Sequence, residues 1–153
     1  MFDRILIPTD GSEPAEHAIP TGIDLAAAHD ATVYAMYVVE PVPLGGYAAG
    51  MSAASSEHGE YTEQQEAEAE AALDIVSEAG LEADVDVVET VKYGEPDEAI
   101  VTYAETHNVD RVVVGSHGRG TVEKLVLGSV AERTVRRSDV PVVTVRADTA
   151  GQS

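Results

Sequence analysis

The feature that most constrains this fold is a regular alternation of short apolar runs with longer segments of helical periodicity. Runs of β-branched and aliphatic residues, typical of buried strands, occur at residues 4–9, 32–39, 83–91, 111–114 and 140–145. Segments with apolar residues three or four positions apart lie between them, at 13–29, at 57–79, from 96 onward, and between the last two runs. Strands that alternate with helices favour a parallel sheet covered by helices on both faces. The chain therefore predicts one α/β domain at residues 1–147, followed by a short solvated tail at 148–153.

Local signals refine the ends of these elements. Ser12 is an expected N-cap, and Pro14 suits the first turn of the helix that follows. Pro20 should kink that helix, because proline removes an interior hydrogen bond. Gly80 is the expected stop of the second helix. Residues 41–56, rich in Pro, Gly, Ala and Ser, predict a long loop of the kind that is usually functional or disordered.

The charge of the chain argues against several classes of partner. Nine Lys and Arg against 28 Asp and Glu give a net charge of −19, whereas nucleic acids and anionic membranes bind basic surfaces. There is no cysteine, no apolar leader and no run of about 18 apolar residues, so we expect a cytoplasmic protein without disulfides or a membrane span.

The acidic side chains are concentrated in one segment. Residues 57–78 hold eight acidic residues and no Lys or Arg. Molar salt would screen their mutual repulsion, which favours adaptation to a high-salt cytoplasm, as in a halophilic archaeon. An ordinary acidic protein with one solvated acidic helix is the alternative.

A loop of small residues after the fourth strand points to a ligand. It carries the pattern Gly115-x2-Gly118-x9-Gly128-Ser129. Residues without bulky side chains let backbone N–H groups approach an anion, and a helix N-terminus adds partial positive charge. Asp10 and Val38 stand at the ends of the first two strands, on the same edge of a parallel sheet, where ligands of this fold class bind. The pattern predicts a phosphate cradle in a crevice long enough for a nucleotide, although glycines after a strand can also merely turn the chain.

The two-part spacing resembles the nucleotide-binding signature of the universal stress protein family, in its ATP-binding branch. The likeness covers essentially the whole chain, through ILIPTDGS at 5–12, GEPDEAI at 94–100, VVVGSHGRG at 112–120 and PVVTV at 141–145. It implies a single open, Rossmann-like sheet of five parallel strands in the order 3-2-1-4-5, with four helices on its two faces, similar to the adenine nucleotide alpha hydrolases. It also implies ATP binding and a homodimer.

The resemblance further implies which residues hold the nucleotide. The family's phosphate-holding positions are matched by Gly115, Gly118, Gly128 and Ser129. Asp10 matches the position near the adenosine, where a carboxylate can accept ribose hydroxyls, and Val38 the position whose backbone contacts adenine. The full implied set is Pro8, Thr9, Asp10, Val38, Val114, Gly115, Ser116, His117, Gly118, Arg119, Gly120, Thr121, Gly128, Ser129 and Val130.

Several of these residues have a second interpretation. Asp10 can be a turn or capping residue, since Asp-Gly-Ser is favourable turn chemistry. His117 is of a type that titrates near neutral pH and suits a base, but a lone histidine in such a loop is more often structural. Arg119 can pair with phosphates or lie in solvent. The histidines of the chain lack metal-ligand spacing, which argues against a histidine metal site.

Catalytic signals are weaker than binding signals. The chain has no Gly-x4-Gly-Lys-Ser/Thr loop and no recognisable Ser-His-Asp or paired-carboxylate arrangement, although Lys124 lies inside the nine-residue spacer. A divalent ion, Mg²⁺ or Mn²⁺, is expected only together with the triphosphate, with Asp10 nearby. We therefore interpret the chain as an ATP-binding stress-response or signalling module with an unknown protein partner. A slow or partner-stimulated ATPase and a nucleotide-free dimeric interaction platform remain alternatives.

The fifth strand, from Val140 to Val145, is the expected dimer contact. In the implied strand order it lies at an edge, where unpaired backbone groups invite association, and the resemblance suggests that two such edges pair. Pro141 limits how far that ladder extends. A charged residue at Val143 should weaken the dimer.

Overall fold

A five-stranded parallel sheet forms the centre of the molecule. The computed structural model describes residues 2–40, 53–116 and 129–146. Its elements are β1 (Arg4–Pro8), α1 (Glu13–His29), β2 (Thr32–Val39), α2 (Ala53–Ala83), β3 (Val87–Tyr93), α3 (Pro96–Thr106), β4 (Arg111–Ser116), α4 (Ser129–Arg137) and β5 (Val142–Arg146). Neighbouring strands pair in parallel in the order β3-β2-β1-β4-β5. The expected fold class and strand order are confirmed.

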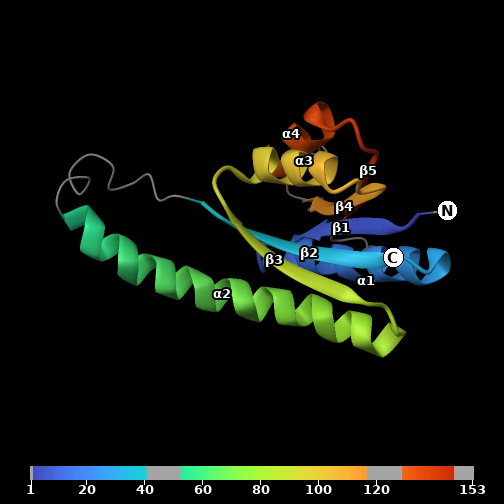
Figure 1. Cartoon of the computed structure of the whole chain (residues 1–153), viewed down its shortest axis with the longest axis horizontal. Coiled ribbons are helices and arrows are strands. Elements are labelled where there is room, and N and C mark those ends of the chain that lie inside the picture. The colour runs from blue at the N-terminus through green and yellow to red at the C-terminus, as the bar shows by residue number, and fades with distance from the viewer. Residues whose placement is uncertain (1, 41–52, 117–128, 147–153) are drawn as a thin grey trace.

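Helices cover both faces of the sheet. Figure 1 shows α1 and α2 on one face and α3 and α4 on the other. Successive side chains of a strand point to opposite faces, so a strand buried on both faces must be apolar at every position. β1 meets this condition: Ile5 and Ile7 pack on the α1–α2 side, Leu6 packs on the α3–α4 side, and all three are fully buried.

Helix α1 begins as its sequence predicts. The Ser12 hydroxyl accepts a hydrogen bond from the Ala15 backbone N–H at 3.4 Å, so the expected N-cap is confirmed. Pro20 lies on the exposed side of the helix, which continues past it to His29. The helix ends at Asp30, whose φ of 59° is left-handed and whose backbone N–H bonds back to the last turn.

The prediction that Gly80 ends the second helix was wrong. Helix α2 continues to Ala83, and the chain turns at Asp84, with a φ of 64°. Gly80 is buried inside the helix, and a Cβ there would lie 2.9 Å from the Val85 carbonyl oxygen and would also collide with the Val87 side chain. The glycine is therefore explained by the close return of the chain toward β3, a contact that local helix rules do not describe.

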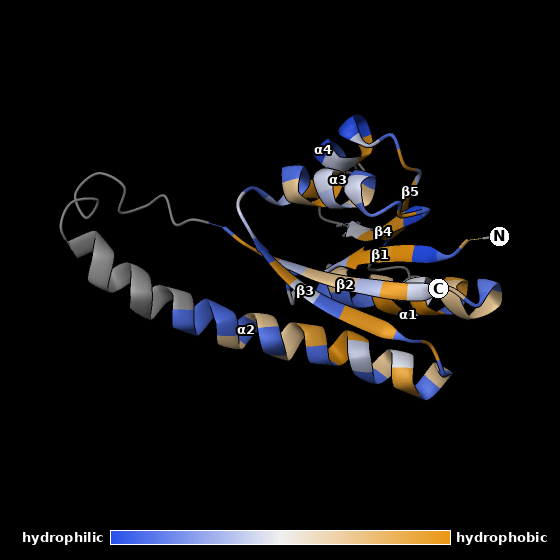
Figure 2. Ribbon diagram, viewed as in Figure 1, coloured by the Kyte–Doolittle hydropathy of each residue, from blue (hydrophilic) through white to orange (hydrophobic). Residues whose placement is uncertain are grey.

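Other boundaries shift for similar reasons. Helix α2 is longer at both ends than the expected 57–79; its apolar positions, visible as orange bands in Figure 2, include the buried Leu73 and Val76. Strand β3 starts at residue 87 rather than 83 because α2 and its turn occupy the preceding residues. Strand β4 extends beyond 114, since residues 115 and 116 pair with β5, which starts at 142 rather than 140.

Some expectations lie outside the described residues. They concern residues 41–52 of the expected loop, Leu125 and Val126 of the fourth helical pattern, and the tail. The last residues of the expected loop, 53–56, belong to α2. Within the described ranges, no helix combines the length and the apolar character needed to cross a membrane.

Candidate functional site

The sheet opens between β1 and β4 at its carboxyl edge. The pairing of these strands reaches Leu6 opposite Val112, whereas β1 continues to Pro8 and β4 to Ser116. The chain leaves β1 toward α1 on one face, while α4, the next described element after β4, covers the other face. This is the topological switch point of the sheet, the place where open α/β sheets bind ligands.

The loop from β1 to α1 is held by hydrogen bonds of its own. The Thr9 N–H donates to the Met36 carbonyl at 2.8 Å, which ties the loop to β2. The Thr9 hydroxyl accepts from the Gly11 N–H at 3.1 Å, and the Asp10 Oδ1 accepts from the Ser12 N–H at 2.9 Å. Gly11 has a φ of 81°, which favours glycine. Asp10 is therefore a turn residue, as one interpretation held, and its exposed carboxylate still faces solvent at the crevice edge.

Gly115 is required by a contact between backbones. A Cβ at this residue would lie 2.5 Å from the Pro14 carbonyl carbon, still closer to the Pro14 oxygen, and 3.1 Å from the Ala15 nitrogen. The first turn of α1 thus rests directly on β4, next to the switch point. This contact accounts for the glycine without a ligand, and it also brings the α1 N-terminus to the crevice.

Four other implied residues lie close to the opening with their side chains at least partly buried. Val114 is buried and Val38 half-buried, both on the α3–α4 side of the sheet. The buried Ser116 hydroxyl donates to the Val145 carbonyl at 3.4 Å. Val114 and Ser116 can therefore offer a ligand only their backbone groups. Pro8 is half-buried at the end of β1.

The remaining implied residues fall in or next to residues 117–128. Outside the described residues lie His117, Gly118, Arg119, Gly120, Thr121 and Gly128. Ser129 is the first described residue of α4, which runs to Arg137. Val130 is half-buried against the α3–α4 side of the core, and its carbonyl accepts a hydrogen bond from the Thr134 hydroxyl at 2.8 Å.

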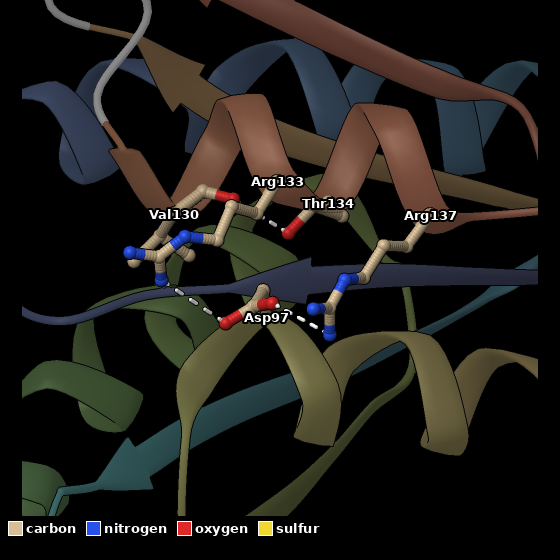
Figure 3. Close-up of polar contacts among 5 residues, drawn as sticks. All are labelled: Asp97, Val130, Arg133, Thr134 and Arg137. Carbon is tan, nitrogen blue, oxygen red and sulfur yellow. Dashed lines mark hydrogen bonds and ion pairs between the residues drawn. The ribbon is translucent and has the colours of Figure 1, made fainter.

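Sequence reasoning missed an ion-paired cluster beside this helix. Asp97, in the first turn of α3, is 1% exposed and contacts two arginines of α4 (Figure 3). Its Oδ1 lies 3.4 Å from Arg133 Nη1, and its Oδ2 lies 3.1 Å from Arg137 Nη1. By its type alone, Asp97 is an acidic residue that suits the positive end of the helix dipole. The four-residue spacing of the arginines was the one available signal, and it does not identify the partner.

A separate groove of about 270 Å³ lies between the end of β3 and α3. Tyr103 lines this groove, and its ring stacks on His107 with a centroid distance of 3.8 Å. Lys92 Nζ lies 5.7 Å from the centroid of the Tyr103 ring. Burial raises the pKa of the Tyr103 hydroxyl. Glu95 also lines the groove, and β2 separates β3 from the switch point, so this is not the expected phosphate site.

Comparison with known proteins decides the family. The sequence profile of the Universal stress protein family matches residues 1–146. The chain belongs to the universal stress protein family. One relative, universal stress protein MJ0531 of Methanocaldococcus jannaschii, is 34% identical over 146 residues, covering 95% of this chain and 83% of the relative.

Solved structures of universal stress proteins share the fold. The structure of MJ0577, from the same archaeon, has a TM-score of 0.77 and 27% identity, covering 95% of this chain and 96% of that one. A universal stress protein in complex with cAMP gives a TM-score of 0.67 at 23% identity, over 96% and 98% of the two chains. An Arabidopsis thaliana family member with AMP bound gives a TM-score of 0.71 at 17% identity, covering 99% of this chain and 95% of that one. At identities of 23% and 17%, these last two structures support the fold alone.

Proposed function

We propose that this chain binds ATP at the β1–β4 switch point and acts as a nucleotide-dependent stress-response or signalling module. The observation that carries the proposal is that the pairing of β1 with β4 ends at Leu6 and Val112, before either strand ends. The exposed carboxylate of Asp10 stands at one side of this opening. Two solved structures with this fold hold cAMP and AMP, which supports an adenine nucleotide as the ligand.

The proposed roles follow the groups that each residue offers. Asp10 accepts hydrogen bonds from the ribose hydroxyls, and the backbone at Val38 contacts adenine. The first turn of α4, from Ser129, meets the phosphates through its backbone N–H groups and the positive end of the helix dipole. Gly118 and Gly128 complete the phosphate cradle in this proposal.

A divalent cation would bind together with the triphosphate. The described residues contain no group of three or more His, Cys, Asp or Glu side chains able to hold a metal. Asp10 fits a minor role, because its carboxylate is exposed and, within the described residues, the Ser12 N–H bonds to its Oδ1. Mg²⁺ or Mn²⁺ would then take its other ligands from phosphate oxygens and water.

The direct test is titration of the purified protein with Mg-ATP in calorimetry at high salt, together with mass spectrometry of any co-purified small molecule. We expect saturable 1:1 binding and an adenine nucleotide in the extract. Protein that carries no nucleotide and binds none at millimolar ATP would refute the proposal. Single-turnover hydrolysis separates a module that holds ATP from a slow or partner-stimulated ATPase.

Asp10→Asn tests the ribose contact. Asparagine retains an acceptor for the Ser12 N–H, so the turn should persist. Loss of a charged acceptor should weaken adenosine binding roughly fivefold and Mg-ATP binding at least as much. Asp24→Asn, an exposed position on α1 outside the loop, is the matched control. Equal affinities of Asp10→Asn and the wild type would remove Asp10 from the site.

We also propose that β5 forms a homodimer contact. β5 lies at an edge of the sheet and is short and valine-rich. The Val143 side chain packs against the α1–α2 side of the core, so a charge there would disturb the fold as well as an interface. Thr144 is exposed and provides a cleaner test.

Thr144→Asp is expected to raise the dimer dissociation constant at least about tenfold, because like charges would meet across the two-fold axis. Sedimentation velocity over a concentration series measures this change. Thr90→Asp on β3, the opposite edge strand, is the control and should leave the dimer intact. If Thr144→Asp dimerises as tightly as the wild type, β5 is not the interface.

A further inference from the structure

Asp97 is a buried carboxylate that joins two helices. It belongs to α3, and its two oxygens are divided between Arg133 and Arg137 of α4, one turn apart (Figure 3). A buried carboxylate is costly unless it is paired, so this arrangement strongly favours one position of α4 relative to α3. The two guanidinium groups are about half exposed, at 51% and 52%, whereas the Asp97 side chain is 2% exposed.

Helix α4 is seated by further contacts on the same side. Ala131 and Thr134 are buried, and the Thr134 hydroxyl donates to the Val130 carbonyl at 2.8 Å. Arg133 follows Ser129, the first residue of α4, by one helical turn. The ion pairs with Asp97 therefore act on the turn next to the helix N-terminus.

We propose that Asp97 is a positioning residue for the phosphate end of the nucleotide site, acting through Arg133 and Arg137 to hold the first turn of α4. The proposal rests on the function proposed above, in which that turn meets the phosphates. Asp97 contacts no nucleotide in this scheme. Its role is to hold α4 in place, so that the backbone N–H groups of the first turn occupy fixed positions before the ligand arrives.

Positioning and simple electrostatics predict opposite effects for Asp97→Asn. Removal of a negative charge near bound phosphates should strengthen ATP binding if only long-range attraction matters. Loss of positioning should weaken it. We expect ATP affinity to fall roughly tenfold while adenosine affinity is unchanged, because adenosine has no phosphate to contact α4.

A pair of arginine variants tests the same point with less risk to folding. Arg137 contacts Asp97, whereas Arg136 on the same helix pairs with Glu132 at 3.2 Å. Arg136 and Arg137 carry the same charge at adjacent positions of α4, so a purely electrostatic effect should be of similar size in Arg136→Gln and Arg137→Gln. Positioning predicts that Arg137→Gln weakens ATP binding several-fold and that Arg136→Gln leaves it near the wild-type value.

The experiment is calorimetric titration of all variants with Mg-ATP and with adenosine, at a temperature where circular dichroism shows each to be folded. If the wild type binds neither ligand, the proposed function fails, and this inference fails with it. If the wild type binds both, the inference alone is overturned by either of two results. One is equal losses of ATP and adenosine affinity in Asp97→Asn; the other is equal ATP affinities for the two arginine variants. If Asp97→Asn does not fold, the arginine pair decides.

Discussion

Gly115→Ala is expected to lower the free energy of unfolding by about 3 kcal/mol, which corresponds to roughly 10 °C in Tm for a domain of this length. The added methyl group would overlap the Pro14 carbonyl, with the carbonyl carbon only 2.5 Å away. Both sides of this contact are backbone, so no side-chain rotation can relieve it. Either the first turn of α1 or the end of β4 must move, and both border the switch point. Chemical denaturation followed by circular dichroism measures the loss.

Gly22→Ala is the matched control, because Gly22 lies on α1 and also faces the sheet. A Cβ there would meet side-chain atoms of Ile7, with Cγ1 at 2.9 Å, rather than backbone. Alanine in a helix interior also gains about 1 kcal/mol over glycine, which offsets part of the crowding. We expect less than half of the loss seen for Gly115→Ala. Equal losses would show that the contact between the α1 and β4 backbones is not the cause.

Low salt is expected to destabilise the protein through a row of carboxylates on α2. Exposed acidic residues recur at every fourth position, at Glu66, Glu70, Asp74, Glu78 and Glu82. Like charges at this spacing cost about 0.2–0.5 kcal/mol per pair, so the four successive pairs together cost about 1–2 kcal/mol. No ion pair of the described residues involves α2. Because the Debye length falls from about 10 Å at 0.1 M to about 3 Å at 1 M salt, stability should rise with potassium chloride.

A double variant isolates this effect from the general influence of salt. Glu70→Gln with Glu78→Gln interrupts all four pairs and should raise stability at 0.1 M salt by about 1–2 kcal/mol, with little gain at 2 M. Asp24→Asn with Glu105→Gln changes the net charge equally, but neither residue has a like charge three or four positions away. If both double variants behave alike, the row is not responsible. A wild type equally stable in dilute buffer would argue against adaptation to high salt.

Much of the fold could be predicted because its signals are local. The Ser12 cap depends on residues three positions away, and the apolar runs of β1 and β2 determine two strands buried on both faces. Boundaries failed where packing between elements decided them. Gly80 is a buried packing residue facing Val85 and Val87, although its type alone suggested a helix stop.

The candidate site was predictable as a region rather than as a set of contacts. Asp10 follows the end of β1 and Gly115 lies near the end of β4, so both are at the carboxyl edge that parallel strand order predicts. Their local roles differ from simple expectation: Asp10 stabilises a turn, and Gly115 admits the first turn of α1. Both roles come from geometry that residue types leave open.

The sequence by itself determined the α/β class, the family and the edge of the sheet where a ligand would bind, because periodicity, capping and motif spacing depend on neighbours along the chain. Only the tertiary structure decided why Gly115 has no side chain and which groups hold α4. Both depend on contacts between distant parts of the chain, Pro14 with Gly115 and Asp97 with Arg137. Residues so far apart in the chain meet only when the sheet has formed and the helices have packed onto its two faces.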